Sequence, residues 1–464
     1  MSYGIVSYGA YLPRHRLSRA AIRETLGQGG GKGTRSVAGY DEDTTSMGVE
    51  AARKARWNGS FAPASLHFAT TAPAYADKTN ATAVHAALGL GREVFATDHA
   101  SSVRSAVGAL RAAAADGGLA VLSDVRTGRP GSADEAGGGD GAAAFLFGTG
   151  EAVIAEVVAQ ASATAEFLDR WRAPGEDASS LWEERFGFGI YLPLIQDVAG
   201  RALATAGVER PDHVVIASPH ARAAGAAAKA FGDAVVDGVE PAAGNLGAAH
   251  AGLQLAEALD RASAGETILV LSAADGADAM LLRVTEAISA RPADAAALAG
   301  FARAVDIDYA TFLTWRGVLR REPPRRPDPA RPEGPPAQRA ADWKYGFVGS
   351  RCRNCSRVHV PPQRVCAGCA AVDAMDAEPM SSRRGTVSTY TVDRLAYSLS
   401  PPVVTAAIDF DGGGRFSCEL TDCSPEEIRV GTRVEMTFRR MYTAGGVHNY
   451  FWKARPTVED SDAE

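Results

Sequence analysis

The sequence predicts a layered α/β protein followed by a small, β-rich C-terminal domain. Short apolar runs alternate with helix-forming segments through the first 300 residues, as in α/β folds. The same order of elements begins again near Tyr191, which indicates two similar halves. After residue 345, two Cys-x-x-Cys pairs precede a series of short β-rich segments.

The first half follows from its apolar pattern. We expect strands within 4–13, 66–71, 118–125 and 137–148, and helices at 16–26, 44–56 and 79–88. An acidic run ends at Asp43, so Asp43 or Thr44 is the expected N-cap of the second helix. The glycine run 27–35 contains Lys32, but Gly33 stands where a phosphate-binding loop needs Ser or Thr. We therefore interpret this run as a flexible loop.

Residues 95–110 organise the first half. Val94 to Ala96 indicates a buried strand, small residues follow it, and an Ala-rich helix continues to about Ala115. Ser101 and Ser102 lie on the turn, where the free N–H groups of the helix start favour negative charge. Small residues also suit a tight turn for steric reasons alone. A reactive and a structural role for Ser101 therefore both stay open.

The second half repeats this alternation. We expect strands at 213–217, 267–272 and 275–284, and helices at 192–206, at 221–231 and after the segment 244–250. His220 follows the first of these strands, where it is either a site residue or a capped structural histidine. Residues 286 to about 320 are expected to be helical. The proline- and arginine-rich run 321–336 predicts a semi-rigid linker.

A metal motif begins the C-terminal part. Two Cys-x-x-Cys pairs are separated by ten residues, and each pair can direct both sulfurs at one ion. Four thiolates suit tetrahedral Zn²⁺ and leave no open coordination position, so we expect a structural zinc rather than a redox pair. The expected ligands are Cys352, Cys355, Cys366 and Cys369.

The β-rich segments 386–392, 403–410, 415–420 and 433–438 predict a small barrel of the OB type. Cys418 and Cys423 are expected to be ordinary barrel residues. Such barrels often bind nucleic acid, and the stretch 315–364 is basic enough for nucleic acid or for the phosphates of a cofactor. We expect no nucleic acid, because the chain as a whole carries a net charge of −7.

Composition limits the remaining possibilities. The 464 residues are 46% hydrophobic and 22% charged, which is typical of globular proteins. No apolar run approaches the roughly 18 residues of a spanning helix, so no membrane association is expected. The N-terminus has no signal-peptide pattern, which favours the cytoplasm. All six cysteines follow residue 350, and a disulfide framework is not expected.

The turn at 95–110 and the motifs Gly139-Asp-Gly-Ala, Ser-Pro-His220 and Gly-Asn245-Leu-Gly resemble those of thiolase-superfamily condensing enzymes. The most similar groups are 3-hydroxy-3-methylglutaryl-CoA synthase and β-ketoacyl synthase III. The resemblance implies a five-layered αβαβα body of two similar halves. It also implies that Ser101 occupies the position of the family's nucleophilic Cys and that the synthase Glu maps near Thr71, so both expected groups are missing.

Segments 349–355, 361–366 and 448–453 resemble a zinc-ribbon and OB-fold domain that is fused to, or encoded beside, thiolase-like proteins and is associated with acyl-CoA. The two resemblances together imply an acyl-CoA or acyl-carrier thioester as substrate. They imply C–C bond formation or cleavage, or acyl transfer; some thiolase-like proteins with this ribbon resemble retro-aldolases. The alternative is a non-catalytic acyl-CoA-binding subunit that supports a partner enzyme. A homodimer is expected in either case.

The expected site follows from these motifs. The catalytic residues would be Ser101, His220 and Asn245. The substrate-binding residues would be His99, Ser102, Arg104, Gly139, Asp140 and Gly141. The expected domains are the two thiolase-like halves at 1–165 and 166–300, a helical segment and linker at 301–345, the zinc ribbon at 346–375, the barrel at 376–458 and a disordered acidic tail at 459–464.

Overall fold

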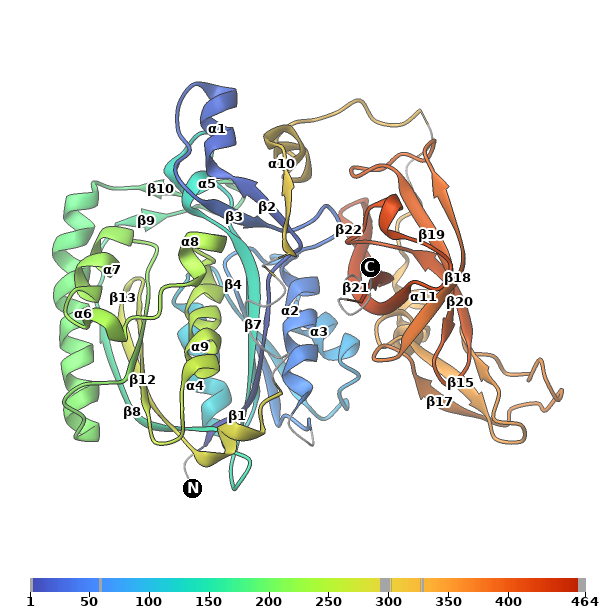
Figure 1. Cartoon of the computed structure of the whole chain (residues 1–464), viewed down its shortest axis with the longest axis horizontal. Coiled ribbons are helices and arrows are strands. Elements are labelled where there is room, and N and C mark those ends of the chain that lie inside the picture. Colours follow the sequence, from blue (N-terminus) through green and yellow to red (C-terminus); the bar gives the residue numbers. More distant parts are fainter. Residues whose placement is uncertain are drawn as a thin grey trace. The chain divides into compact units, whose positions relative to one another are not determined.

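The computed structural model describes residues 3–57, 61–292, 301, 303–325, 327 and 329–457. Its contacts divide the chain into two units (Figure 1). The α/β unit consists of residues 1–39, 43–84 and 91–316. The C-terminal unit consists of 317–464 together with two short segments from the first half of the chain, 40–42 and 85–90. Within the described residues, no helix combines the length and apolar character that crossing a membrane requires.

One mixed sheet of nine strands runs through the α/β unit. β1 (Gly4–Tyr11) pairs with β7 (Asp140–Gly148) along most of its length, but with β8 (Ala155–Thr164) only through Gly4 and Ile5. The nine strands therefore form two half-sheets that are joined at the N-terminal end of β1. In order across the sheet, the strands are β11 (His213–Ala217), β12 (Thr267–Ala273), β13 (Gly276–Val284), β8 (Ala155–Thr164), β1 (Gly4–Tyr11), β7 (Asp140–Gly148), β6 (Leu119–Val125), β4 (Ser65–Thr70) and β5 (Phe95–Ala100).

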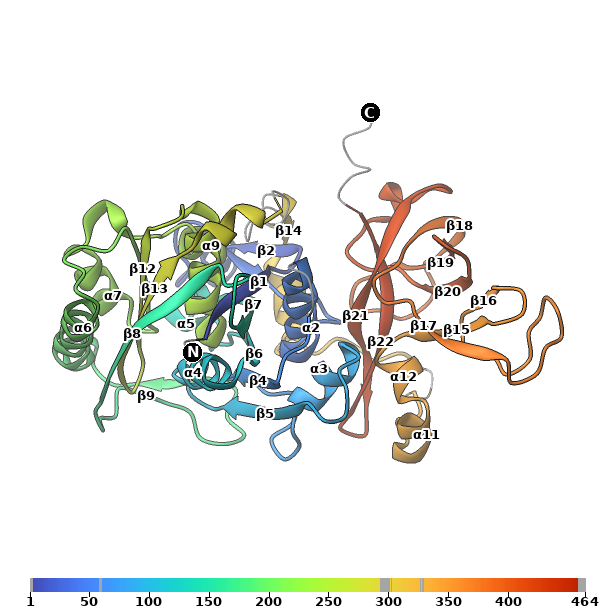
Figure 2. The same cartoon turned by 90° about the horizontal axis from the view of Figure 1, so that it is seen from below.

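Helices cover both faces of the two half-sheets and produce the five αβαβα layers expected from the sequence (Figure 1, Figure 2). α4 (Ser105–Asp116) and α9 (His250–Arg261) form the middle layer, α2 (Thr44–Lys54) packs on the outer face of the first half-sheet, and α6 (Glu184–Ala206) and α7 (Ala221–Ala228) cover the second. The other helices of this half of the chain are α1 (Arg19–Leu26), α3 (Ala81–Ala87), α5 (Ala133–Gly137), α8 (Val239–Ala243) and α10 (Tyr309–Trp315).

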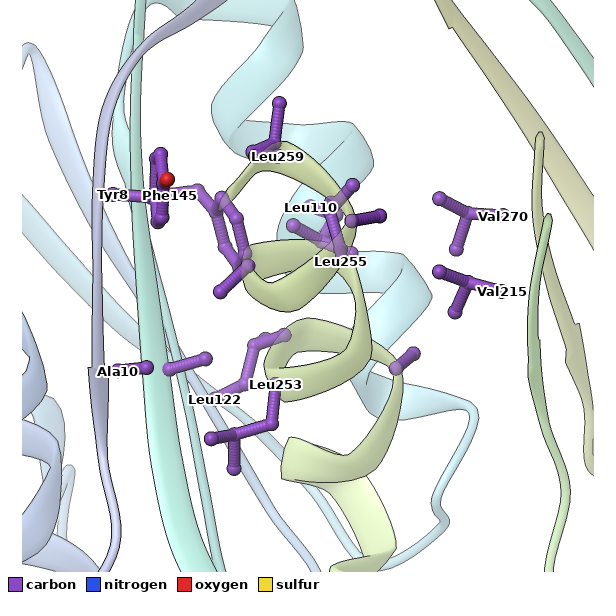
Figure 3. Packing of buried hydrophobic residues seen from close by; sticks show 14 of the residues in the cluster. Tyr8, Ala10, Leu110, Leu122, Phe145, Val215, Leu253, Leu255, Leu259 and Val270 are labelled. Carbon is purple, nitrogen blue, oxygen red and sulfur yellow. The ribbon is translucent and has the colours of Figure 1, made fainter. Parts of the chain in front are cut away.

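The core is centred on α9. Every residue of this helix from His250 to Leu259 is buried, as expected for a helix with a sheet on either side. Leu253, Leu255 and Leu259 project from α9 among side chains of both half-sheets and of α4 (Figure 3). Fully burying one such side chain stabilises the fold by roughly 1.5–3 kcal/mol. The apolar side chains of α9 therefore pack against both half-sheets and hold the two halves together.

Several sequence expectations need correction. The helix expected at 16–26 begins only at Arg19, because residues 15–18 form β2 (His15–Ser18) between β3 (Thr34–Val37) and β14 (Val305–Ile307). The segment 286–320 is not one helix: it contains a short turn of 3₁₀-helix, β14 and α10, while 293–300 and 302 lie outside the described residues. The expected buried strand at 94–96 is the edge strand β5, where the Phe95 side chain is 62% exposed. The N-cap expectation is confirmed, since Asp43 and Ser46 form a capping box at α2.

The C-terminal unit holds a three-stranded ribbon and a five-stranded sheet. The four expected barrel strands are present, and β22 is a further strand that the sequence reasoning missed. The ribbon consists of β16 (Val358–His359), β15 (Val348–Cys352) and β17 (Met375–Pro379), and the sheet of β20 (Arg415–Glu419), β19 (Val403–Phe410), β18 (Arg384–Asp393), β21 (Arg433–Ala444) and β22 (Val447–Pro456). The linker ends in α11 (Gly334–Arg339) and α12 (Ala341–Lys344), and the expected tail 459–464 lies outside the described residues.

A buried charge cluster fastens residues 40–42 within the C-terminal unit. Asp41 Oδ2 lies 3.0 Å from Lys453 Nζ, and Glu42 Oε1 lies 3.1 Å from Arg439 Nη1. A third carboxylate, Asp422, lies 2.6 Å from Arg439 Nη2. Burial alone would raise the pKa of Asp41, but Lys453 and Arg439 outweigh burial and hold this pKa below its usual value. The cluster thus keeps Asp41 ionised in the interior.

Candidate functional site

The turn after β5 holds Ser101 in an unusual backbone conformation. Its φ is +89°, in the left-handed region that non-glycine residues rarely adopt. The Ser101 N–H donates to the Thr70 carbonyl of the neighbouring strand at 3.2 Å. The Ser101 side chain is exposed, and its hydroxyl has no hydrogen-bond partner among the described residues. Such strain concentrates at functional sites and costs of order 1–3 kcal/mol, so the surrounding fold must enforce it.

The next residue, Ser102, is paired with a carboxylate. Ser102 Oγ donates to Asp275 Oδ2 at 2.5 Å. Asp275 lies on the turn between β12 and β13 with a φ of +51°, and its side chain is exposed. The Asp275 N–H also donates to the Tyr191 hydroxyl at 3.4 Å. The serine turn of one half is therefore connected to the turn of the other half through a group that can accept a proton.

His220 has both ring nitrogens engaged by the backbone. Nδ1 accepts from the Ala223 N–H at 3.2 Å and so caps the N-terminus of α7. Since Nδ1 is an acceptor, the neutral ring carries its proton on Nε2, which donates to the Glu184 carbonyl at 2.9 Å. The side chain is buried, and its ring centroid lies 5.6 Å from that of Tyr191. These contacts are those of a structural histidine that caps the N-terminus of α7.

Asp169 is a titratable neighbour of His220 that the sequence reasoning missed. Burial raises the pKa of Asp169, while His220 and Arg170 act in the opposite direction. The two side chains approach each other across Gly187. A Cβ there would lie 2.2 Å from Asp169 Oδ1 and 2.8 Å from His220 Cδ2. The close approach thus requires glycine at 187, but this requirement is visible only in the folded chain, and the sequence around Asp169 holds no signal for its place near His220.

Asn245 lies on the segment between α8 and α9. Its Nδ2 donates to the Ser218 carbonyl at 2.9 Å, and its Oδ1 accepts from the Gly247 N–H at 3.1 Å. Its backbone pairs with residues 137–139, since Asn245 N–H donates to Gly137 and Gly139 N–H donates to Asn245. The amide has two N–H groups, and only one of them has a hydrogen-bond partner among the described residues.

A closed ring of contacts joins Ser101, His220 and Asn245. On one side, Thr71 Oγ1 donates to the buried carboxylate of Asp124 at 2.8 Å, and Asp124 accepts from the Ala248 N–H at 2.9 Å. On the other side, Ser218 Oγ accepts from the His220 N–H at 3.1 Å. In order, the ring runs through Ser101, Thr70, Thr71, Asp124, Ala248, Gly247, Asn245, Ser218, His220, Tyr191, Asp275 and Ser102. The three expected catalytic residues are thus linked through intermediates from both halves, and within the described residues no hydrogen bond joins any two of them directly.

The two polar residues that flank the serine turn, His99 and Arg104, contact other parts of the fold. His99 Nε2 lies 3.2 Å from His67 Nδ1, and burial, followed by His67, lowers the pKa of His99. Arg104 Nε donates to Asp278 Oδ2 at 2.8 Å, and its Nη1 donates to the Asp275 carbonyl at 2.8 Å. His99 therefore faces a neighbouring strand, whereas Arg104 fixes the Asp275 turn against α4.

The glycine loop at 139–141 is packed tightly. Asp140 is fully buried, accepts from the Ala38 N–H at 2.7 Å and forms ion pairs with Arg35 and Arg316. A Cβ at Gly139 would lie 1.9 Å from the Ala243 carbonyl, and one at Gly141 would lie about 3 Å from two leucine side chains. In this structure the two glycines are small because neighbouring groups leave no room for a side chain, and the charge of Asp140 is used in ion pairs within the fold.

The four expected zinc ligands converge in the ribbon. Cys352 Sγ lies 3.7 Å from Cys369 Sγ, and Cys355 Sγ lies 3.4 Å from Cys366 Sγ. All four sulfurs lie within 4.8 Å of one another. Four sulfurs at the usual Zn–S distance of about 2.3 Å would be about 3.8 Å apart, so the donor set fits a tetrahedral ion.

The C-terminal unit matches two family descriptions. Residues 344–376 match the ChsH2 rubredoxin-like zinc ribbon domain, and residues 378–439 match the ChsH2 C-terminal OB-fold domain. A DUF35 domain-containing scaffold protein of Methanocaldococcus jannaschii is 33% identical over 118 residues, which are 24% of this chain and 83% of that protein. The expected ribbon and OB-fold domains are confirmed.

Solved structures share the fold of the α/β unit at low identity. A 3-oxoacyl-(acyl carrier protein) synthase III from Pseudomonas aeruginosa has a TM-score of 0.54 at 21% identity and covers 61% of this chain and 98% of its own. A hydroxymethylglutaryl-CoA synthase crystallised with CoA has a TM-score of 0.57 at 17% identity and covers 67% of this chain and 89% of its own. The thiolase-like fold is thereby confirmed.

Curated relatives match at higher identity. Hydroxymethylglutaryl-CoA synthase of Archaeoglobus fulgidus is 33% identical over 342 residues, which are 68% of this chain and 99% of that protein. The enzyme of Aeropyrum pernix is 30% identical over 343 residues, which are 68% of this chain and 95% of that protein. The chain therefore belongs to the hydroxymethylglutaryl-CoA synthase family and carries a ChsH2-type zinc ribbon and OB-fold at its C-terminal end.

Proposed function

We propose that the chain binds an acyl-CoA or acyl-carrier thioester at the ring of contacts around Ser101. There it makes or breaks a C–C bond or transfers the acyl group. The observation that carries this proposal is the strained, exposed turn of Ser101, which forms hydrogen bonds to both halves of the α/β unit. The relatives that match 68% of the chain are hydroxymethylglutaryl-CoA synthases by name, which supports a thioester as substrate.

In the covalent form of the reaction, Ser101 takes the place of a cysteine nucleophile. Its Oγ attacks the thioester carbonyl, the C–S bond breaks, and CoA leaves as the thiol. His220 has no free ring nitrogen to accept the serine proton, so we assign this role to the exposed carboxylate of Asp275, which accepts from the neighbouring Ser102. Asp275 would take the Ser101 proton in the bound complex and return it to the departing CoA sulfur. The free N–H of Asn245 would stabilise the negative charge on the carbonyl oxygen.

The second candidate is a non-catalytic acyl-CoA-binding subunit that supports a partner enzyme. Two observations favour it: no cysteine precedes Cys352, and backbone groups occupy both nitrogens of His220. A hydroxyl without a dedicated base is a weak nucleophile. The binding part of the proposal is common to both candidates, so the two differ only in turnover.

One experiment separates the candidates. The full chain is incubated with acetyl-, acetoacetyl- and longer acyl-CoA thioesters, free CoA is quantified, and intact-protein mass spectrometry records any acyl adduct. The covalent form predicts an adduct on the wild type that Ser101→Ala abolishes, while the exposed control Ser289→Ala keeps it. Turnover without an adduct would favour a non-covalent reaction. Binding without turnover would favour the subunit, and the absence of any binding would refute both candidates.

We also propose that the cysteine quartet holds a structural zinc ion. The four sulfurs come from two knuckles, and the Gly368 N–H donates to Cys366 Sγ at 3.3 Å, as is usual for a metal-bound thiolate. A closed set of four sulfurs leaves no position for substrate. The ion would therefore stabilise the ribbon without taking part in the reaction.

The chain is further proposed to form a homodimer and to associate with a partner enzyme. β5 is one of the two edge strands of the nine-stranded sheet, and Phe95 on it is exposed. An unpaired edge of this kind readily pairs with a second copy. The scaffold protein that resembles the C-terminal unit supports a partner for that unit.

A further inference from the structure

Two histidines on neighbouring strands contact each other at one edge of the nine-stranded sheet. His67 lies on β4 and His99 on β5, and His67 Nδ1 lies 3.2 Å from His99 Nε2. The two ring centroids are 5.3 Å apart. β5 is an edge strand, and within the described residues it pairs with β4 alone. The imidazole pair therefore adds a side-chain contact to the backbone pairing that holds β5 on the sheet.

Two neutral rings satisfy this contact. Facing nitrogens 3.2 Å apart leave room for one hydrogen, so one ring donates and the other accepts. On its other side, His67 Nε2 lies 2.9 Å from Ser65 Oγ, a hydroxyl that can donate or accept. Either direction of the hydrogen bond between the rings is thus compatible with Ser65.

Additional protons disrupt the contact. If both facing nitrogens carried hydrogens, the pair would lose its hydrogen bond and two positive charges would lie side by side. His99 Nδ1 has no hydrogen-bond partner among the described residues, and a Cβ at Gly108 of α4 would lie only 3.1 Å from this atom. A cationic His99 would therefore lack an acceptor on the side that faces α4.

Little negative charge is available to balance a protonated pair. Asp116 at the end of α4 lies 3.9 Å from His67 Nε2, and 47% of its side chain is exposed. Asp98, beside His99 on β5, already accepts from two backbone N–H groups at the start of α3. Burial is the main cause that lowers the pKa of both histidines; His67 lowers that of His99 further, while Asp116 and Asp98 act in the opposite direction. Among the described residues, no other charged group acts on either ring.

The histidine pair lies next to the serine turn. His99 precedes Ser101 by two residues, and the Ser101 N–H donates to the Thr70 carbonyl of β4 at 3.2 Å. Loss of the contact between β4 and β5 at the histidines would therefore loosen the strand that holds Ser101 in its left-handed conformation. Local opening of this kind requires less free energy than global unfolding.

We infer that the His67–His99 pair is an acid-sensitive latch, which holds β5 and the serine turn on the sheet while both rings are neutral and releases them on proton uptake. The usual histidine pKa is 6.5, and the pKa values of both rings in the fold are lower, so the open state binds protons more readily than the closed one. The closed state is therefore fully stable above pH 6.5 and weakens as pH falls below it. The latch itself rests on the contacts of β5, whereas its effect on a thioester rests also on the proposed function.

Hydrogen exchange followed by mass spectrometry tests the latch on the full chain at about pH 7.5 and about pH 5.5. Wild type and His99→Gln are compared at the same pH, which cancels the intrinsic pH dependence of exchange. The variant takes up one proton fewer, and one proton changes the opening equilibrium by up to about 10-fold at one pH unit below the usual histidine pKa. For peptides that cover residues 95–101, the ratio of wild-type to variant exchange rates should rise about 3- to 10-fold on acidification. An unchanged ratio would overturn the inference.

Two further variants supply independent tests. Asp116→Asn removes the carboxylate that favours a charged His67, so opening should require a lower pH; an unchanged midpoint would contradict the latch. Because the Asp116 side chain is partly exposed, this variant decides the question even where His99→Gln does not fold. His213→Gln changes a histidine of β11, the opposite edge strand, that pairs with Glu266, and should leave exchange at 95–101 as in the wild type. An effect equal to that of His99→Gln would overturn the assignment to the pair.

A binding measurement distinguishes the latch from the proposed function. By calorimetry, the affinity of the wild type for acetyl-CoA should fall about 3- to 10-fold more on acidification than that of His99→Gln. An exchange difference without thioester binding at either pH would support the latch and refute the proposed function. Thioester binding with an unchanged exchange ratio would refute the latch and leave the proposed function standing.

Discussion

Substitution of His220 separates the structural role of this residue from a catalytic one. His220 makes two buried hydrogen bonds, one as the cap of α7 and one to the Glu184 carbonyl. His220→Ala removes both. His220→Asn keeps a side-chain acceptor of the kind preferred at helix N-termini but removes the imidazole. The pair of variants therefore changes the cap and the ring independently.

The magnitude follows from these two bonds. Loss of an N-cap costs typically about 1 kcal/mol. Loss of the bond to Glu184 costs about another 1 kcal/mol. The ring also packs on Tyr191, with 5.6 Å between centroids, so truncation removes apolar contact as well. We expect His220→Ala to lower the free energy of unfolding by at least about 2 kcal/mol and His220→Asn by about half as much.

Urea unfolding followed by circular dichroism measures these differences, and thioester turnover is assayed under conditions where each variant is folded. If the ring only caps α7, His220→Asn keeps the activity of the wild type per folded molecule. If the ring takes part in chemistry, both variants lose turnover, and His220→Asn does so with little loss of stability. A His220→Ala protein as stable as the wild type within about 0.5 kcal/mol would refute the capping argument.

Three further predictions concern the rest of the chain. Asp41→Asn should destabilise the C-terminal unit by about 3 kcal/mol at pH 7, because it leaves Lys453 buried beside one partner fewer. Since the pKa of Asp41 is depressed, its contribution is present above the usual carboxyl pKa and is lost as pH falls through the folded pKa, so the urea curves of wild type and variant should approach each other as the solution is acidified; an equal difference at neutral and acidic pH would refute the reasoning. Plasma mass spectrometry should find one zinc per chain, and unchanged zinc in both Cys355→Ser and Cys366→Ser would reject the site. Light scattering should give twice the chain mass and Phe95→Lys should lower it; a 48.3 kDa wild type would contradict the dimer.

The sequence alone determined the features that depend on neighbouring residues. The capping box of α2 needs only Asp43 and Ser46, three residues apart, and its chemistry is local. The strand β19 has the bounds expected from its apolar pattern. The spacing of the cysteines within each knuckle specifies a metal motif without knowledge of the fold. Alternation of such segments, together with family motifs, was then sufficient for the αβαβα layers.

Tertiary structure decided the features that depend on partners far apart in the chain. Residues 15–18 are a strand rather than a helix because β3 and β14 supply hydrogen bonds on both sides, and β14 lies almost 300 residues away. The exposure of Phe95 follows from the position of β5 at the edge, since the same sequence between two strands would be buried. Apolar content specifies that a strand forms, but strand order specifies what covers it.

The candidate site shows most clearly which features follow from local sequence and which depend on tertiary contacts. A strand followed by Ser-Pro-His indicates a place for His220, but only the folded chain shows that Glu184 and Ala223 occupy its two nitrogens. Arg126 and Arg172 carry no signal in their local sequence, because both reach Thr71 only when the segments that follow β6 and β9 (Arg170–Trp171) pack beside the end of β4. Hydrogen-bond partners and charge balance are properties of the three-dimensional neighbourhood. They therefore decide the chemistry that a motif can perform.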